Sequence, residues 1–232
     1  SATGQPKHRD RYQPRMPNFR FMPYDDPAAL AEALDGDVAA VIVEPIQGEG
    51  GVNVPSEGCL EEMSVLCHEN GSLLIVDEIQ TGFCRTGPLF AISGHDVEPD
   101  FLTMGKGIAG GFPFAAFALT EGVAARLGRG DHGGTYCGNP LGCAVAHAVL
   151  NELLEKDIPR NVEAMGSVIL DRMRRWHAED PDRIRGVRGR GLLAAMELAD
   201  PGAAERLLQA LGNLRLRQPV IVGQLDGSPL RR

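Results

Sequence analysis

Short apolar runs and amphipathic segments alternate along the chain, and this order predicts an α/β fold. Continuous apolar runs at residues 38–43 and 73–76 suit strands of a parallel sheet that are buried on both faces. The segment between them, residues 56–71, carries apolar residues at helical spacing: Leu60, Met63 and Cys67. Strand, helix and strand in this order form a crossover, and a crossover joins parallel neighbours.

Capping residues predict where further helices begin. Asp26-Pro27 is a cap and first-turn pair that opens a short helix over residues 27–34. Asn139-Pro140 is a pair of the same kind, and the alanine-rich helix that it opens runs to about Leu154. A following helix is expected to have one apolar face, made of Val162, Met165, Ile169, Met173 and Trp176.

The remaining apolar runs complete the expected order of elements. They predict strands over residues 115–119 and 192–198 and a helix over 206–211. We expect a larger sheet domain over residues 1–155 and a small α+β domain over 156–232.

Composition and charge exclude several function classes. The 232 residues are 43% hydrophobic and 23% charged, which supports a packed core. A net charge of -8 argues against nucleic-acid binding, and the basic clusters at 7–15 and 183–190 are more typical of solvated loops or subunit contacts. No apolar run approaches the ~20 residues that span a membrane. The chain starts without a methionine or a signal-peptide pattern, and we interpret this start as a truncated or processed end.

Cysteines and histidines give no sign of a metal site. The five cysteines form no Cys-x-x-Cys pair, and the six histidines are scattered without metal-ligand spacing. An odd number of cysteines is most simply explained by free thiols in a reducing cytoplasm. We therefore expect a cytoplasmic protein that holds no metal.

The main candidate chemistry lies where the run 73–76 ends in Asp77 and Lys106 follows among glycines. An acid at the carboxyl end of a parallel strand can hold a pyridinium nitrogen protonated, and a lysine can form a Schiff base. Pyridoxal phosphate (PLP) chemistry requires both groups. A P-loop ATPase also has an acidic strand end, but Gly107 follows Lys106 where that loop needs Ser or Thr. Taken alone, Lys106 is more simply a solvated loop residue.

Five segments in a fixed order closely resemble class III aminotransferases, a family of fold type I PLP enzymes. The segments are 44–51, 77–82, 85–87, the loop around Lys106, and 132–140. Within the family, Gly130-Asp131-His132-Gly133 and residues 1–6 are most similar to the acetylornithine and succinylornithine group. The resemblance implies a mostly parallel α/β sheet domain, here incomplete, followed by part of a small α+β domain.

The resemblance also implies roles for four residues around PLP. Lys106 would form the Schiff base with the cofactor and later carry a proton between the substrate carbon and the cofactor. Asp77 would pair with the pyridinium nitrogen, and Gln80 would donate a hydrogen bond to the phenolic oxygen. Thr135 would bind the cofactor phosphate from the neighbouring subunit of a homodimer with shared active sites.

Two further residues would act on the substrate. Glu49 resembles the gate glutamate that pairs with a mobile arginine when no α-carboxylate is bound, and Arg215 is the candidate arginine. The segment that carries Arg215 follows residues 196–198 sooner than in family members. Glu44 is either a carboxylate behind Asp77 and Gln80 or a buried acid at a strand end.

The implied reaction is transfer of an ω-amino group, with N-acetylornithine as the expected donor, to 2-oxoglutarate, giving a semialdehyde and glutamate. Alternatives are 4-aminobutyrate or ornithine as donor, or mutase chemistry on the same scaffold. The resemblance covers only the later half to two thirds of a family member and lacks the Gly/Ser-rich turn that cradles the phosphate. A non-catalytic remnant with weak cofactor retention therefore also remains open.

Overall fold

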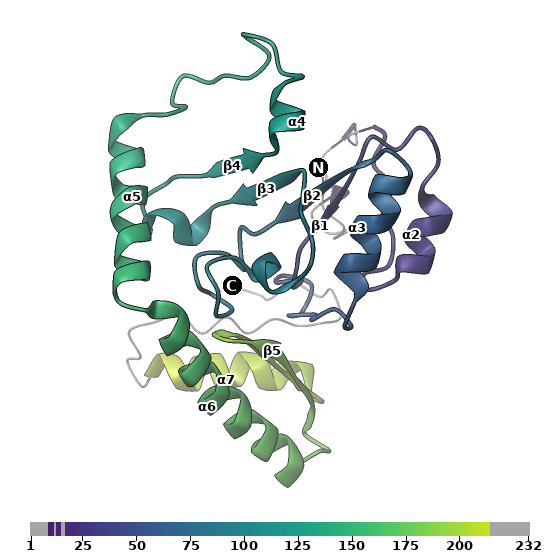
Figure 1. Cartoon of the computed structure of the whole chain (residues 1–232). Coiled ribbons are helices and arrows are strands. Elements are labelled where there is room, and N and C mark those ends of the chain that lie inside the picture. The colour runs from purple at the N-terminus through teal and green to yellow at the C-terminus, as the bar shows by residue number, and fades with distance from the viewer. Residues whose placement is uncertain (1–8, 12, 15–16, 214–232) are drawn as a thin grey trace.

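The computed structural model describes residues 9–11, 13, 14 and 17–213, and its largest layer is a four-stranded sheet (Figure 1). The strands are β1 (Ala40–Val43), β2 (Leu73–Asp77), β3 (Phe101–Met104) and β4 (Ala116–Leu119), and they lie in this order across the sheet. The pairs β1–β2 and β2–β3 are parallel, whereas β3–β4 is antiparallel. The mostly parallel sheet that the sequence predicts is therefore present.

The crossover between β1 and β2 contains helix α3 (Cys59–Glu69), as the apolar pattern predicts. The helix starts at Cys59 rather than at Ser56, because Gly58 has a left-handed φ of 81° and turns the chain just before the first helical residue. Strand β3 was not predicted. Its four residues include Thr103, and so short an apolar run is ambiguous until a neighbouring strand pairs with it.

Both predicted capping pairs begin helices. The Asp26 carboxylate accepts a 2.9 Å hydrogen bond from the Ala29 N–H at the start of α2 (Pro27–Ala33). The Asn139 Oδ1 accepts a 2.7 Å bond from the Gly142 N–H at the start of α5 (Pro140–Glu155). In each helix proline occupies the first turn. A backbone N–H there has no intrahelical acceptor, so proline loses no hydrogen bond by lacking one.

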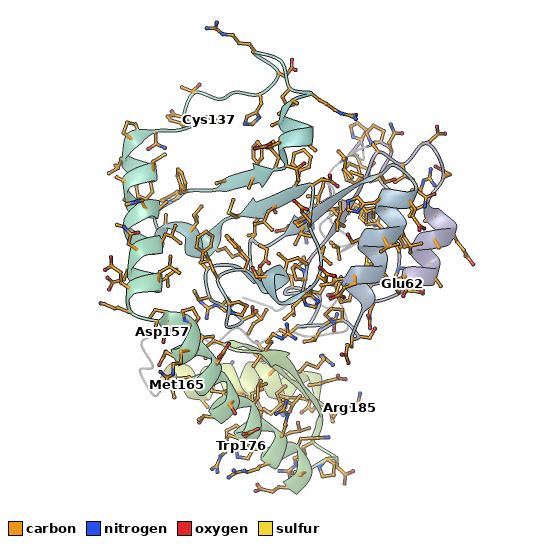
Figure 2. All side chains as sticks on the ribbon, viewed as in Figure 1. Glu62, Cys137, Asp157, Met165, Trp176 and Arg185 are labelled. Carbon is orange, nitrogen blue, oxygen red and sulfur yellow. The ribbon has the colours of Figure 1, made fainter. Side chains whose placement is uncertain are left out.

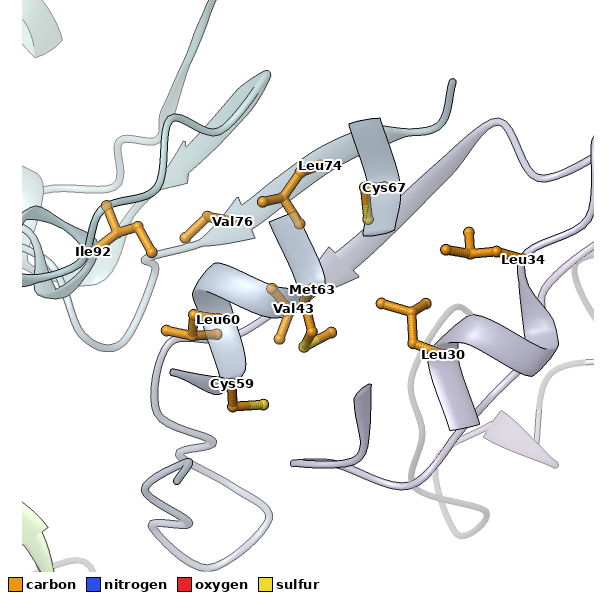
Figure 3. Packing of buried hydrophobic residues seen from close by; sticks show 10 residues of the cluster. All are labelled: Leu30, Leu34, Val43, Cys59, Leu60, Met63, Cys67, Leu74, Val76 and Ile92. Carbon is orange, nitrogen blue, oxygen red and sulfur yellow. The ribbon is translucent and has the colours of Figure 1, made fainter. Parts of the chain in front are cut away.

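The hydrophobic core lies between one face of the sheet and the helices α2 and α3 (Figure 3). Its buried residues come from both layers and, for Ile92, from the 3₁₀ helix Ala91–Gly94: Leu30, Leu34, Val43, Cys59, Leu60, Met63, Cys67, Leu74, Val76 and Ile92. Alternate strand residues point to the other face, where Ile42 of β1 and Phe117 of β4 are 55% and 43% exposed. The sheet thus has one well-covered face and one that carries exposed apolar side chains.

The later part of the chain forms an antiparallel hairpin with two helices beside it. The hairpin pairs β5 (Ile184–Arg190) with β6 (Leu193–Leu198), and the helices are α6 (Ile158–Glu179) and α7 (Pro201–Asn213). The expectation that the basic cluster 183–190 is a solvated loop is wrong. Residues Ile184–Arg190 form strand β5 paired with β6, and the Arg188 side chain is half-buried.

The predicted apolar face of α6 is only partly correct. Val162 is buried, but Met165, Ile169 and Trp176 are 44%, 42% and 41% exposed, and Figure 2 marks two of them on this helix. The helix buries Gly166 and Leu170 instead, because the missing side chain of Gly166 allows the hairpin backbone to approach. This close backbone contact therefore sets which face of α6 is buried, and that face differs from the one that apolar spacing predicts.

Short elements connect these layers and present the loops. They are the 3₁₀ helices η1 (Ala91–Gly94) and η2 (Lys106–Ala109) and the one-turn helix α4 (Glu121–Ala124). The hairpin is attached to the sheet layer through the Leu192 N–H, which donates a 3.0 Å hydrogen bond to the Arg85 carbonyl. Among the described residues, no helix is both long enough and apolar enough to cross a membrane.

Candidate active site

Asp77 is the last residue of β2 and lies at the carboxyl edge of the parallel strands. Its Oδ1 accepts a 3.0 Å hydrogen bond from the Ile79 N–H, so the side chain folds over the start of the following turn. The neighbour across the sheet is Thr103 of β3. Because β2 and β3 are parallel, both strands lead into the same edge, where open α/β sheets bind their ligands.

Lys106 reaches this edge from β3. It begins η2 two residues after the strand ends, and its side chain is exposed. Its φ of 43° is left-handed, which a non-glycine residue adopts only where its surroundings enforce it. The glycines on either side lie against the turn after β2: Gly105 faces Ile79, and a Cβ on Gly107 would stand 3.0 Å from Phe83. Lys106 is therefore held beside the turn that follows Asp77.

Gln80 lies in that turn and meets a second loop, residues 47–53. Its Nε2 lies 3.4 Å from the Glu49 Oε1 and donates to it. A Cβ on Gly48 would stand 2.6 Å from the Gln80 side-chain amide, so only glycine leaves room for Gln80 in its present position. The structure thus brings Gln80 and Glu49 together.

Loop 47–53 is a closed turn that presents Glu49. The Gln47 and Asn53 backbones exchange hydrogen bonds of 2.9 and 3.0 Å, and the Asn53 Nδ2 donates to the Gln47 Oε1 at 2.8 Å.

The Glu44 Oε2 accepts a 3.0 Å bond from the Gly48 N–H and fixes the start of the loop. Burial raises the pKa of Glu44, and the nearby charges of Asp77, Lys106 and Glu49 also act on its pKa. Glu44 is thus the half-buried carboxylate behind the site.

Glu78 has no exposed surface, although it is the direct neighbour of Asp77. Its Oε1 accepts a 2.8 Å bond from the Ile92 N–H, and its Oε2 accepts a short hydrogen bond from the Thr81 hydroxyl. Burial raises the pKa of Glu78, and these hydrogen bonds offset part of that effect. Glu78 joins the turn that carries Gln80 to the first turn of η1. Sequence reasoning gave Glu78 no role. The alternation of side-chain direction at the end of a strand is the signal that would have separated it from Asp77.

Thr135 is not brought to this edge in the described part of the chain. Thr135 is exposed in the segment between α4 and α5, which Figure 1 shows running out beyond the sheet. Cys137 marks the same segment in Figure 2. Arg215 lies outside the described residues. Sequence reasoning also missed Arg188, a half-buried arginine on β5 whose Nε donates a 3.2 Å bond to the Gly51 carbonyl of loop 47–53.

The residues at the edge fit PLP. They supply an exposed amine on Lys106, a carboxylate on Asp77 and an amide on Gln80, groups that could bind its aldehyde, ring nitrogen and phenolic oxygen. The missing side chain of Gly48 leaves room for the Gln80 amide. Among the described residues, no group of three or more His, Cys, Asp or Glu side chains could hold a metal ion.

Comparisons with known proteins give a consistent picture. The family model described as "Aminotransferase class-III" matches residues 1–222. The acetylornithine aminotransferase of Methanopyrus kandleri is 44% identical over 205 residues, which cover 88% of this chain and 52% of the relative. The chain spans about half the length of the curated relatives it matches.

Solved structures confirm the fold. An ornithine aminotransferase of Toxoplasma gondii, in which PLP partially occupies the active site, is 42% identical with a TM-score of 0.82. The match covers 88% of this chain and 49% of that one. An acetylornithine aminotransferase of Elizabethkingia anophelis is 40% identical with a TM-score of 0.79, covering 85% of this chain and 51% of that one. The expected α/β PLP-dependent transferase fold type I is thereby confirmed, and the chain belongs to the class III aminotransferase family.

Proposed function

We propose that this protein takes part in PLP-dependent transfer of an ω-amino group to 2-oxoglutarate, which yields a semialdehyde and glutamate. The observation that carries the proposal is the placement of Asp77 and Lys106 at one carboxyl edge of a parallel sheet. Class III aminotransferases depend on PLP, and the side chains at this edge match the polar groups of that cofactor.

Each residue has a distinct task at this edge. When bound, PLP would supply an acceptor for the amino group of the donor and a ring that withdraws electrons from the carbon that carried it. The Asp77 carboxylate keeps a proton on the ring nitrogen, and its bond from the Ile79 N–H fixes the direction of the carboxylate. The Lys106 amine anchors the cofactor and, when released, moves a proton at Nζ. Gln80 orients the ring by donating to the phenolic oxygen.

Glu49 is proposed to face the incoming amine donor. It lies beside Gln80 on loop 47–53 and is exposed, so a substrate can reach it. An acid at this position can pair with Arg215 when no α-carboxylate is present and release it when one arrives. The same edge can then accept first an ω-amine and later the acid 2-oxoglutarate.

We propose N-acetylornithine as the amine donor, because two curated relatives at 44% and 43% identity are acetylornithine aminotransferases. Ornithine is the second candidate, since a solved ornithine aminotransferase is 42% identical. The two donors differ in whether the α-amine carries an acetyl group, and their δ-amines are alike.

We further propose a homodimer in which Thr135 binds the cofactor phosphate of the neighbouring subunit. Thr135 lies in an exposed segment that also shows large apolar side chains to solvent: Leu127, Tyr136 and Leu141. If a second subunit packed on this segment, it would cover these apolar side chains while bringing Thr135 to its site. The five free cysteines suit a reducing compartment, and we place the protein in the cytoplasm.

The role of Lys106 is tested by trapping. We expect borohydride reduction of the purified protein with PLP, followed by peptide mass mapping, to place a pyridoxyl group on Lys106. The matched control is Lys156, which is exposed on the surface and pairs with Glu152. A pyridoxyl group on another lysine, with Lys106 unmodified, would show that the assignment is wrong.

The donor is tested by comparing kcat/KM for N-acetylornithine, ornithine and 4-aminobutyrate with 2-oxoglutarate as acceptor. We expect N-acetylornithine to give the highest value. A clear preference for ornithine would favour the second candidate. A preference for 4-aminobutyrate would contradict both proposals for the donor while leaving ω-amino transfer in place.

A further inference from the structure

Arg188 makes two directional contacts that join the hairpin to the candidate site. Its Nε donates a 3.2 Å hydrogen bond to the Gly51 carbonyl, 137 residues away in sequence. Its Nη1 lies 2.9 Å from the Glu197 Oε2 on the neighbouring strand β6. The Arg188 and Glu197 side chains are only 30% and 31% exposed, so solvent screens this ion pair less than one on the open surface.

The contact falls on a loop that needs external support. Val52, the residue after Gly51, has a left-handed φ of 55°. A β-branched residue is strained there, and such a conformation persists only where the surroundings hold it. Hydrogen bonds inside the loop link Gly51 and Val52 to the Gly48 carbonyl at 3.1 Å each. Arg188 therefore contacts loop 47–53 at Gly51. The preceding residues of the same loop carry Glu49 and lie against Gln80.

We propose that Arg188 is a positioning residue for the amine donor: by holding the Gly51 carbonyl it fixes loop 47–53 and keeps Glu49 beside Gln80. This inference rests on the proposed function, in which Glu49 faces the donor. It assigns to the hairpin β5–β6 a direct part in shaping the site. The guanidinium is suited to this task because it donates from Nε and Nη1 in one plane, toward Gly51 and Glu197 respectively.

Lysine could not replace Arg188. A lysine ammonium could retain the charge opposite Glu197, but it has no rigid fork with which to hold a carbonyl at the same time. Glu197 orients the guanidinium, so Glu197→Gln should weaken the same contact without removing it. We expect Arg188→Ala to weaken the contact with the Gly51 carbonyl most, Arg188→Lys to weaken it less, and Glu197→Gln to weaken it least.

The first test measures the loop itself by amide hydrogen exchange in the purified protein with PLP. The amides of Gly51, Val52 and Asn53 are hydrogen-bonded inside the loop and report its opening. In Arg188→Ala we expect their exchange to quicken by at least about tenfold, the size of one lost hydrogen bond to a charged group. Arg185→Ala is the matched control, because Arg185 is exposed on the same strand β5 (Figure 2). Unchanged exchange in Arg188→Ala would overturn the proposal.

The second test separates positioning from a general structural role. In Arg188→Ala we expect KM for the amine donor to rise about tenfold while kcat changes much less, since the loop acts on donor binding. The same change in a Glu49→Gln background should raise KM little further, because the residue through which Arg188 acts is already altered. An equal rise in both backgrounds would show that Arg188 acts by another route and would overturn the proposal.

The two tests distinguish this inference from the proposed function. If the unaltered protein with PLP shows no amino transfer, the proposed function fails, and the exchange measurement still decides whether Arg188 holds the loop. If transfer occurs and Glu49→Gln leaves KM unchanged, Glu49 has no part in donor binding. That result would overturn the role of Arg188 in the site even if the loop opens.

Discussion

At the scale of single residues, the neighbouring acids Asp77 and Glu78 show how position divides two similar side chains. Asp77 is half-buried at the open edge of the sheet, whereas Glu78 points away from that edge and has no exposed surface. Successive residues at a strand end point to opposite sides, so one acid is available to a ligand and the other organises the turn. The Asp-Glu order by itself predicts a site, and the alternation decides which acid belongs to it.

Replacing Glu78 with glutamine should change how stability depends on pH. Burial raises the pKa of Glu78 above its ordinary value of 4.5, so the folded protein holds this proton more tightly than the unfolded chain. Its contribution to stability is fully present below pH 4.5 and is lost as pH rises through the raised folded pKa. Because glutamine cannot ionise, Glu78→Gln should gain stability relative to the parent as pH rises.

Urea unfolding of parent and Glu78→Gln across pH 4.5 to 8 measures this difference. We expect the free energy of unfolding of the variant minus that of the parent to increase over this range. Glu61→Gln is a suitable control, since hydrogen bonds, first from the backbone and also from His95, lower the pKa of Glu61, so its effect falls mainly below pH 4.5 and its difference should be nearly flat over this range. A difference that is flat with pH for Glu78→Gln would contradict a buried, hard-to-ionise carboxyl.

Gly48→Ala should impair the site without unfolding the protein. The added Cβ would stand 2.6 Å from the Gln80 amide, and the flexible end of that side chain would be displaced rather than the backbone. We expect PLP affinity to fall about tenfold, the loss of roughly one hydrogen bond, with little change in unfolding midpoint. Gly36→Ala is the matched control, because a Cβ there meets nothing within 4 Å. Equal PLP affinities in the two variants would contradict this packing.

Strand-end and glycine patterns predicted Asp77 and Lys106, and the family resemblance added Gln80 and Glu49; the structure places all four around one edge. The signal for Asp77 and Lys106 was local, because one ends a strand and the other lies among glycines. Arg188 could not be found this way. Its significance depends on the Gly51 carbonyl 137 residues away, and a hydrogen bond between distant segments leaves no local pattern.

At the scale of elements, helices with capping pairs and strands inside a crossover were predictable. Features that depend on pairing or contact with another segment were not. Helices α2 and α5 begin where Asp26 and Asn139 supply a side-chain cap. Strand β5 was missed because its Arg and Gly residues look like a loop until β6 pairs with them. The buried face of α6 was misassigned because a glycine contact, which apolar spacing does not record, sets its rotation.

Gly166→Ala tests that contact. Alanine normally stabilises a helix interior by about 1 kcal/mol relative to glycine. Here the added Cβ would stand 2.5 Å from the Gly191 carbonyl oxygen, and Gly191 itself is pressed against the Thr86 backbone. Overpacking of backbone against backbone costs about 1–3 kcal/mol, so we expect a net loss of stability.

Urea unfolding midpoints of the parent and two variants check this expectation. Gly122→Ala in α4 is the control, because a Cβ there has open space and should be neutral or stabilising. A Gly166→Ala variant as stable as Gly122→Ala would show that α6 is not held by close approach to the hairpin.

At the scale of the whole molecule, exposed apolar side chains separate into distinct regions. Ile42 and Phe117 lie on the uncovered face of the sheet, and Met165 and Trp176 lie on the outer side of α6. A third region, residues 127–141, contains the proposed phosphate contact Thr135. Within the part of the chain that the structure describes, only this region joins apolar exposure to a residue that the proposed site needs from a second subunit, so it is the surface on which we expect self-association.

Leu141→Glu should therefore weaken the proposed homodimer. Leu141 is 63% exposed in the first turn of α5, where a negative charge interacts favourably with the helix dipole, so the helix itself should not be destabilised. Burying the new charge in an interface would be costly, and we expect the dissociation constant to rise at least about tenfold. Val65→Glu on α3 is the matched control, since Val65 is 54% exposed on the opposite side of the sheet from α5 (Figure 1). Sedimentation velocity over a range of concentrations measures both variants against the parent. If Leu141→Glu associates as the parent does, or if Val65→Glu alone dissociates, the subunits meet through another surface and Thr135 cannot complete a neighbouring site.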